Sequence, residues 1–390
     1  MTSSVSDLKR HSPLAIGATI LIGMICSLVG NTMPAFIAVL SRTRSLTEGQ
    51  GGLCAAAYTI GAAVATLGCA LMPSVVRRLK WRGTVSLGMA IMITANVFGA
   101  TAGAFLSTFA SLAFVGLGCG MAMAIVYATL AEGNAARQLG IVIVAQLSAG
   151  AVAIQFLTPL TNQYGSNGLF SVLAGLGVLV LVLTRLSPRR SIRDAPVKVL
   201  DEPPSRTVSA EGWLGVCSVV LFFFSVGGIF AYLEYMGIAW GGSSTHVERD
   251  LSLILLAGIA GSALATAVSS RPGVTLPLVG GYALLLGALA TYLLAKPLVL
   301  FLLVGVVFFF ALTFIMPFQF QVVTKIDQTS SAAMLVNAGM YLGNAAGPAV
   351  CGYLVTADFR LLSAVCLGCC ALSMLLLFTA ITRHRRRAPA

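Results

Sequence analysis

Residues 298–323 read LVLFLLVGVVFFFALTFIMPFQFQVV, which is 26 positions without one charged side chain. About 20 apolar residues in a helix are enough to cross the ~30 Å hydrocarbon core of a bilayer. Helix is the conformation that lipid demands, because every backbone N–H and C=O must find its partner within the segment. We therefore predict a transmembrane helix at 298–323.

Comparable runs lie on both sides of this stretch. They are longer and more evenly apolar than the strands of outer-membrane barrels, which alternate polar and apolar residues over about ten positions. The first run follows a short basic stretch, but its 27 residues favour a retained helix over a cleaved signal peptide. With 298–323 they make twelve predicted spans of an all-α integral membrane protein: 14–40, 51–72, 84–103, 108–131, 139–160, 168–184, 213–240, 251–269, 275–295, 331–355 and 361–382.

The composition excludes most soluble classes of protein. Of the 390 residues, 58% are hydrophobic and 9% are charged, whereas an ordinary soluble domain carries about 25% charged residues. The nine cysteines lie in apolar stretches without metal-binding spacing, and the sequence contains no nucleotide-binding or hydrolase motif. We predict that the protein is not an enzyme, has no cofactor or metal, and binds no nucleic acid.

Basic residues are concentrated on one side of the predicted membrane. With the N-terminus placed inside, the inner segments hold nineteen of the 24 lysines and arginines, and the outer segments hold five. Because positive residues favour the cytoplasmic side, we predict a multi-pass protein of the cell membrane with both termini in the cytoplasm. The same residues account for the net charge of +12 and are placed to contact anionic lipid.

A long polar stretch divides the chain into two halves. Residues 185–212 contain four prolines and ten charges of both signs, and the other connections are short. Six spans before it and six after it are typical of carriers built from duplicated halves. We predict an N-terminal six-helix bundle at 1–184, a cytoplasmic central loop at 185–212 and a C-terminal six-helix bundle at 213–390, acting as a monomer.

Three short motifs accompany this topology. Residues 73–82 read PSVVRRLKWR, span four contains GLGCG at 116–120, and span eleven contains GNAAGPAVCG at 343–352. Together with the 6+6 topology, these stretches resemble the major facilitator superfamily (MFS) of transporters. The chain has Arg77 where the family has an aspartate, and it lacks the arginine that usually precedes the glycines of helix four. The antiporter version of the Gly-Pro signature lies in helix five, whereas here it lies in span eleven.

The resemblance implies a fold of two pseudo-symmetric bundles that surround a central cavity. Spans three, six, nine and twelve would then be peripheral. Basic residues at the inner ends of the spans would take part in gating, with a simple surface pair as the alternative for Glu132 and Arg137. Glycines embedded in apolar helices indicate close helix packing rather than phosphate binding. The expected gating residues are Arg77, Arg78, Arg82, Glu132 and Arg137, and the expected packing residues are Gly116, Gly118, Gly120, Gly343, Gly347 and Pro348.

One charged residue lies within the predicted spans, Glu234 of span seven. A carboxylate at mid-membrane costs about 2.5–3.5 kcal/mol on insertion scales, so such a group normally faces protein or water. Gly227 and Gly241, seven residues before and after it, permit close helix approach and indicate an interior face. No lysine, arginine or histidine lies within any span to pair with it. We predict a proton-coupling site; the alternative is a glutamate held by tyrosine hydroxyls near the outer interface.

Polar side chains fall mostly on the spans that the family uses to line its cavity. Asn337, Tyr341 and Asn344 share one face of span eleven, which indicates either substrate binding or hydrogen bonds between helices. Asn31, followed by Pro34, indicates either a break in span one or a local repair of the backbone around proline. The predicted substrate-binding residues are Asn31, Tyr127, Gln146, Tyr232, Tyr235, Gln319, Asn337, Tyr341 and Asn344.

These features predict a secondary active transporter that works by alternating access. Because the spans hold no lysine or arginine, we expect a small neutral, cationic or amphipathic organic solute rather than a phosphate or a sulfate. Proton-coupled efflux is the leading hypothesis. The alternatives are proton-linked uptake or facilitated diffusion of a small metabolite, and a non-transporting membrane sensor on the same scaffold.

Overall fold

The structure, a computed structural model, describes residues 13–71, 73–101, 103–131, 135–186, 208–269, 273–294, 298–327 and 330–387. Within these ranges the regular structure is helical and no strand is present. The helices are α1 (Pro13–Cys26), α2 (Leu28–Asn31), α3 (Met33–Arg44), α4 (Glu48–Leu71), α5 (Pro73–Thr101), α6 (Phe105–Ala131), α7 (Ala135–Thr184), α8 (Ala210–Ala231), α9 (Leu233–Ala239), α10 (Ser244–Ser269), α11 (Thr275–Leu294), α12 (Leu298–Ile326), α13 (Ser330–Ala357) and α14 (Phe359–Arg387).

The helices account for the apolar runs of the sequence. In the described part of the chain, nine helical stretches are long and apolar enough to cross a membrane. Two shorter apolar stretches, Leu14–Cys26 and Ile141–Leu157, lie in α1 and α7. The prediction of an all-α membrane protein is therefore confirmed. Twelve as the number of spans stays a prediction.

Two of the predicted spans are broken into shorter helices. The first span is divided into α1, α2 and α3, and the second of its breaks is at Thr32, with φ −101° and ψ 12°. Pro34 is in the first turn of α3, where its missing N–H costs nothing because that group has no partner within the helix. The seventh span is divided into α8 and α9 at Tyr232, with φ −113° and ψ 12°. The breaks thus fall in spans that begin the two halves of the chain.

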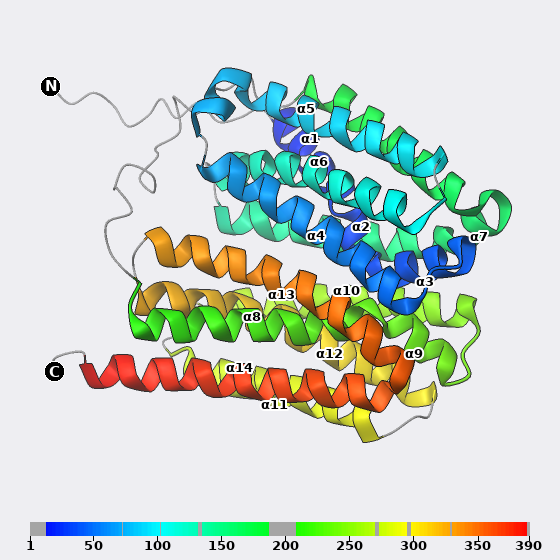
Figure 1. The fold of residues 1–390 in the computed structure, drawn as a ribbon. Coiled ribbons are helices and arrows are strands. Elements are labelled where there is room, and N and C mark those ends of the chain that lie inside the picture. Colours follow the sequence, from blue (N-terminus) through cyan, green and yellow to red (C-terminus); the bar gives the residue numbers. More distant parts are fainter. Residues whose placement is uncertain are drawn as a thin grey trace, which may run out of the picture.

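Helix α7 contains the fifth and sixth predicted spans, joined at Gly165. This glycine has φ 63° and ψ −163°, a conformation that only glycine adopts without a steric penalty. The chain turns back near the α7 label at the right-hand end of Figure 1. A single non-helical residue therefore separates two stretches that the sequence predicts as separate spans.

Glycines let neighbouring helices touch through their backbones. A Cβ atom on Gly116 of α6 would collide with the backbone of Tyr58 in α4. A Cβ atom on Gly343 of α13 would collide with the carbonyl oxygen of Val220 in α8. Small residues permit this approach in membrane helices, so these glycines hold each half together.

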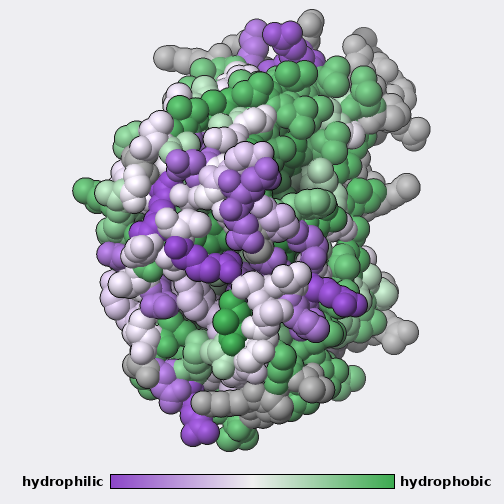
Figure 2. All heavy atoms as spheres, turned by 90° about the vertical axis from the view of Figure 1, so that its right-hand side faces the viewer, coloured by the Kyte–Doolittle hydropathy of each residue, from purple (hydrophilic) through white to green (hydrophobic). Residues whose placement is uncertain are grey.

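The helices form two groups that follow the order of the chain. Helices α1–α7 pack on one another in the upper part of Figure 1, and α8–α14 pack on one another in the lower part. The two groups meet where α4 contacts α13 and where α7 contacts α10. Helices α3 and α9 lie at the right-hand end, which Figure 2 views directly. Hydrophilic residues gather across this end and hydrophobic residues lie toward its edges, as expected for an end in water with sides in lipid.

Candidate functional site

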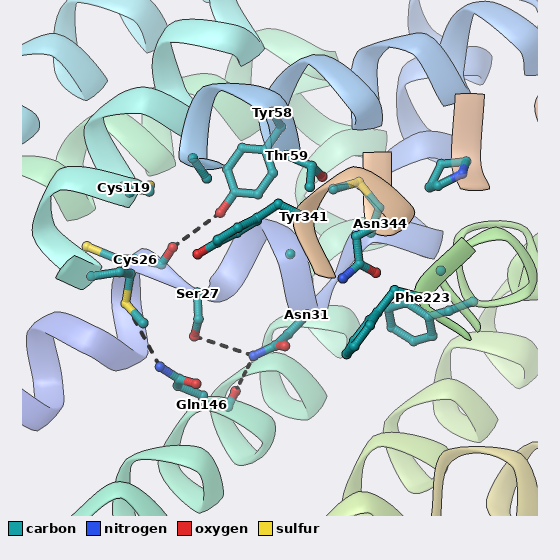
Figure 3. A pocket seen from close by; sticks show the side chains of 18 of the residues that line it. Cys26, Ser27, Asn31, Tyr58, Thr59, Cys119, Gln146, Phe223, Tyr341 and Asn344 are labelled. Carbon is teal, nitrogen blue, oxygen red and sulfur yellow. Dashed lines mark hydrogen bonds between the residues drawn. The ribbon is translucent and has the colours of Figure 1, made fainter. Parts of the chain in front are cut away.

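A cavity of about 340 Å³ lies between the two groups of helices (Figure 3). Both broken spans contribute to its wall, through α1–α3 and α8, and α4, α6, α7, α12 and α13 complete it. Of the residues that the structure describes, none from α5, α11, α14 or 168–184 lines it, in agreement with the expected peripheral spans. Interrupted helices in corresponding positions of two halves point to a binding site, so this cavity is the candidate site.

On the side of the first half, amide groups connect helices across the cavity wall. The Asn31 side-chain amide donates to the Gln146 carbonyl oxygen at 3.0 Å and to the Ser27 hydroxyl at 3.4 Å. The Gln146 side-chain amide in turn donates to the Gly23 carbonyl oxygen at 3.3 Å. Figure 3 shows the Asn31 side-chain amide reaching the backbone carbonyl of Gln146, whose own side chain extends away from Asn31. These residues line the cavity and brace the broken first span against α7.

On the side of the second half, α13 supplies the polar groups. The Tyr341 hydroxyl is 3.5 Å from the Thr66 hydroxyl of α4, so it reaches across to the other half. A Cβ atom on Gly227 of α8 would lie 2.8 Å from the Asn344 side-chain oxygen, which places this amide directly against α8. Tyr341 and Asn344 therefore present one face of α13 to the cavity.

The cavity combines uncharged polar groups with aromatic rings. Among its described lining residues there is no Asp, Glu, Lys, Arg or His. Amides and hydroxyls supply hydrogen bonds, and the ring faces suit apolar groups or an organic cation. The rings belong to Tyr58, Tyr127, Phe223, Phe230, Phe309 and Tyr341.

Glu234 lies outside this cavity, in an ion pair. Its side chain is fully buried, and its Oε1 accepts from Nη2 of Arg42 at 3.1 Å. The sequence interpretation that Glu234 has no cationic partner is therefore wrong. Helix α3 continues to Arg44, past the predicted end of the span at residue 40, and this carries Arg42 onto the carboxylate.

The Arg42–Glu234 pair joins the two halves at the end viewed in Figure 2. Arg42 also donates from Nη1 to the Ser244 hydroxyl of α10 at 3.0 Å. Its side chain is 43% exposed, whereas Oε2 of Glu234 is buried and has no hydrogen-bond partner among the described residues. Arg42 thus holds α3 to both α9 and α10. It also supplies the positive charge beside the buried carboxylate of Glu234.

Arg44, two residues further along α3, is bound to its own half. Its guanidinium donates to the Ser166 hydroxyl at 2.9 Å, to the Thr108 hydroxyl at 2.6 Å and to the Gly99 carbonyl oxygen. It also lies 4.5 Å from the centre of the Phe170 ring, a distance at which a cation and a ring attract each other. Arg44 therefore fixes the end of α3 to α5, α6 and α7.

Tyr232, at the break between α8 and α9, closes the halves near the same end. Its hydroxyl lies 3.0 Å from the carbonyl oxygens of both Glu48 and Pro348. A Cβ atom on Gly52 would collide with this hydroxyl and with the Pro348 carbonyl. On the other side of the interface, the Gln155 amide donates to the Ser252 hydroxyl at 2.7 Å. Close backbone contact and hydrogen bonds thus seal this end of the interface.

The predicted substrate-binding residues divide into two sets. Asn31, Tyr127, Gln146, Tyr341 and Asn344 line the cavity. The others do not line it: Tyr232 is part of the seal, the Tyr235 ring lies 6.1 Å from that of Tyr232, Asn337 is exposed, and Gln319 is buried elsewhere.

Gln319 belongs to a buried network within the second half. Its amide donates to the Ser218 hydroxyl at 3.1 Å and to the Tyr282 hydroxyl at 3.3 Å, and Tyr282 contacts Ser373 of α14 at 2.9 Å. Gln319 lies two turns beyond Leu312, where this part of α12 packs against α8 and α11 rather than facing the cavity. The network explains why a polar side chain is found there without a role in the cavity.

The predicted gating residues are only partly described. Arg82 is half-buried in α5. Glu132 lies outside the described residues, as do the side chains of Arg77, Arg78 and Arg137. The described part of the chain brings together no group of three His, Cys, Asp or Glu side chains that could hold a metal ion.

Several important residues were missed at the sequence level. Tyr58 and Thr59 line the cavity. Tyr58 could have been predicted, because a tyrosine within the apolar residues of span two is a polar group of the kind that indicated the other cavity residues. Arg42 and Arg44 fall just beyond the first apolar run, where charges are normally assigned to a loop. Their partners are up to 202 positions away, so the pattern along the chain did not reveal them.

Comparison with known proteins supports the fold. No protein-family model and no curated protein matches the sequence. A bacterial homolog of the human lysosomal transporter Spinster, solved in an inward-facing and occupied conformation, matches with TM-score 0.71 and 15% identity over 94% of this chain and 96% of that chain. An aspartate-to-alanine mutant of the nucleoside transporter NupG matches with TM-score 0.70 and 13% identity over 95% of this chain and 99% of that one. This chain is therefore a multi-pass, all-helical membrane protein with the fold of the major facilitator transporters.

Proposed function

We propose that the protein is a secondary transporter that moves a small organic solute by alternating access. The observation that carries this proposal is the cavity between the two halves, which is closed toward one end by contacts between those halves. A carrier needs a central site that faces one side of the membrane at a time. The predicted division at 185–212 then separates two bundles, working as a monomer, that rock around the cavity.

The direction in which the cavity opens follows from the position of the seal. Tyr232, Gly52 and the Arg42–Glu234 pair lie at the end where α3 and α9 are found. By the distribution of basic residues, this is the outer end, and both termini are cytoplasmic. The conformation is then inward-facing, with the solute entering from the cytoplasm.

The lining of the cavity defines the class of solute. A phosphate or a sulfate would need a cation at the site, and the described lining has none. Amides from Gln146 and Asn344 and the surrounding rings suit a neutral, cationic or amphipathic organic molecule. On this cavity chemistry we propose efflux over uptake.

The Arg42–Glu234 pair is the proposed coupling element. An ionised Glu234 pairs with Arg42 and stabilises the outer closure, whereas a protonated Glu234 loses this charge pair. Among the described residues, the carboxylate of Glu248 in α10 also acts electrostatically on Glu234. Proton binding would therefore favour opening to the outside, which links the proton to the conformational change.

The same pair also fits a second function. An arginine held 3.1 Å from a buried carboxylate is a stable structural contact as long as no proton enters. Glu234 would then be structural, and the protein would carry out facilitated diffusion of a small metabolite.

Transport into inverted membrane vesicles that contain the protein separates these functions. Proton-coupled efflux predicts uptake of an organic cation that rises with an imposed proton gradient, and Glu234→Gln should remove this dependence while leaving the protein folded. Facilitated diffusion predicts equal uptake with and without the gradient. A cavity that binds no organic solute in a thermal-stability screen would contradict transport and support the sensor alternative.

A further inference from the structure

A second hollow opens on the side of the molecule, between the two halves. It is a groove of about 730 Å³ between α4, α8 and α13. Its wall is almost entirely apolar, with Ile60 from the first half and Leu342 from the second half both more than half exposed at its edges. Exposed apolar side chains on the flank of a membrane helix contact acyl chains, so this groove is open to the lipid.

Tyr341 belongs to the walls of both the groove and the central cavity. On α13, Asn344 and Pro348 continue the wall of the cavity, whereas Ala338 and Leu342 continue the wall of the groove. Figure 3 shows the Tyr341 side chain crossing the cavity beside Tyr58. The two hollows are therefore neighbours, separated by this ring.

Helix α8 shows how the two hollows are arranged along the membrane normal. Residues from Trp213 to Leu221 line the groove, and residues from Phe223 to Phe230 line the cavity. Ten residues of helix, from Trp213 to Phe223, correspond to about 15 Å. The groove thus begins near the start of α8, which is its inner end in the predicted orientation, and leads toward the polar cavity. Trp213 is half-exposed there, as is typical of an aromatic residue at a membrane interface.

We propose that the groove binds the alkyl tail of a single-chain amphiphile whose polar head occupies the central cavity. An acyl chain alone would gain little by leaving the lipid for an equally apolar groove. A molecule with a head in the cavity differs, because the hydroxyls and amides hold the head and the groove accommodates the attached tail. This inference rests on the proposed function and specifies its substrate as an amphiphile taken from the inner leaflet.

The test uses two probes with the same head, butyltrimethylammonium and dodecyltrimethylammonium, bound to the full chain in phosphatidylcholine nanodiscs. Ala338→Trp and Ala63→Trp fill the groove from opposite halves, since both residues line it and neither lines the cavity. Overpacking of this kind should weaken binding of the dodecyl probe about 5- to 150-fold and leave binding of the butyl probe unchanged. Val350→Trp, on the exposed face of α13 away from the groove, is the matched control and should change neither.

The outcomes distinguish the groove from the proposed function. Unchanged binding of the dodecyl probe in both variants would overturn the inference while the butyl probe still reports an intact cavity. An equal loss of both probes would also overturn it, because the substitutions would then act on the cavity. If neither probe binds to the unmodified protein, the proposed substrate class fails, and the inference fails with it. Ala338→Leu and Ala63→Leu are smaller replacements that repeat the test if the tryptophan variants do not fold.

Discussion

Replacing Arg42 by glutamine should open the outer end of the protein. In the structure Oε1 of Glu234 accepts from Arg42 at 3.1 Å inside a site where the carboxylate is fully buried. Hydrogen bonds to charged groups contribute about 1.5–3 kcal/mol, and the loss of one partner of a fully buried pair costs about 3–5 kcal/mol. Because Arg42 itself is 43% exposed, the lower range applies. The ratio of closed to open molecules should then fall about 10- to 150-fold.

The measurement is a distance distribution between spin labels on the two halves at the outer end. Gln163 of α7 and Thr245 of α10 are exposed and suit the labels, in a background where the exposed Cys217 is replaced by alanine. Arg42→Gln should add a population with longer distances, and Glu234→Gln should do the same. Arg360→Gln, which changes another exposed arginine at this end, is the control and should leave the distribution as it is.

Two further measurements, on the variant with both substitutions and as a function of pH, test whether the Arg42–Glu234 pair controls the outer closure. If the two charges act on each other, Arg42→Gln combined with Glu234→Gln should cost less than the sum of the single changes by about 1 kcal/mol or more. The ion pair exists only while Glu234 is ionised, so the open population should rise as the pH falls through its titration, and Glu234→Gln should abolish this change. Additive single effects, or a pH response that survives in Glu234→Gln, would show that the pair does not control the outer closure.

Three further predictions concern the seal, the cavity and the buried network. Gly52→Ala should shift the same distance distribution toward open by about 1–3 kcal/mol, because the new Cβ atom meets the Pro348 carbonyl; an unchanged distribution would contradict the close contact. Asn344→Ala should weaken solute binding about 2- to 13-fold, the value of one hydrogen bond, without lowering the thermal midpoint, and calorimetry of both quantities checks this. Gln319→Leu should leave transport unchanged and alter stability by less than about 1 kcal/mol, since Ser218 keeps its hydrogen bond to Ser373; loss of transport would place Gln319 in the functional site after all.

Hydropathy was sufficient to predict the class of the fold. Lipid permits little besides helix for long apolar runs, so the apolar runs are helical along the described chain. Length and composition do not give the number of spans, because α13 carries Asn337, Tyr341 and Asn344 and is not among the nine described stretches that are long and apolar enough to cross a membrane. A helix that presents polar side chains to a cavity has a lower mean hydropathy than a helix surrounded by lipid, so hydropathy alone does not identify it as a membrane span.

The breaks in spans one and seven were only half visible in the sequence. Pro34 marks the first break, but nothing comparable marks Tyr232, where the chain departs from helix without a proline. The departure places the Tyr232 hydroxyl against carbonyls of α4 and α13. Contacts of this kind depend on tertiary packing, which a local pattern does not contain.

The sequence indicated several of the residues that line the candidate site, but not the hydrogen bonds that these and other polar residues make. Asn31, Gln146 and Asn344 were found because amides are rare in apolar helices and therefore stand out. Gln319 stood out for the same reason, yet its partner is a hydroxyl network inside the second half. A polar residue in a membrane helix shows that a partner exists, but does not distinguish a solute from a neighbouring side chain.

The two arginines at the end of α3 have a mechanical consequence. Side chains two positions apart on a helix are separated by about 200° around the helix axis. Arg44 therefore binds residues of its own half, whereas Arg42 binds residues of the opposite half. The tip of α3 is therefore fixed to the first half by Arg44 and linked to the second half by Arg42. When Arg42 leaves Glu234, Arg44 still holds the tip of α3 to α5, α6 and α7, so α3 stays with the first half and opening at this end separates the two bundles as units.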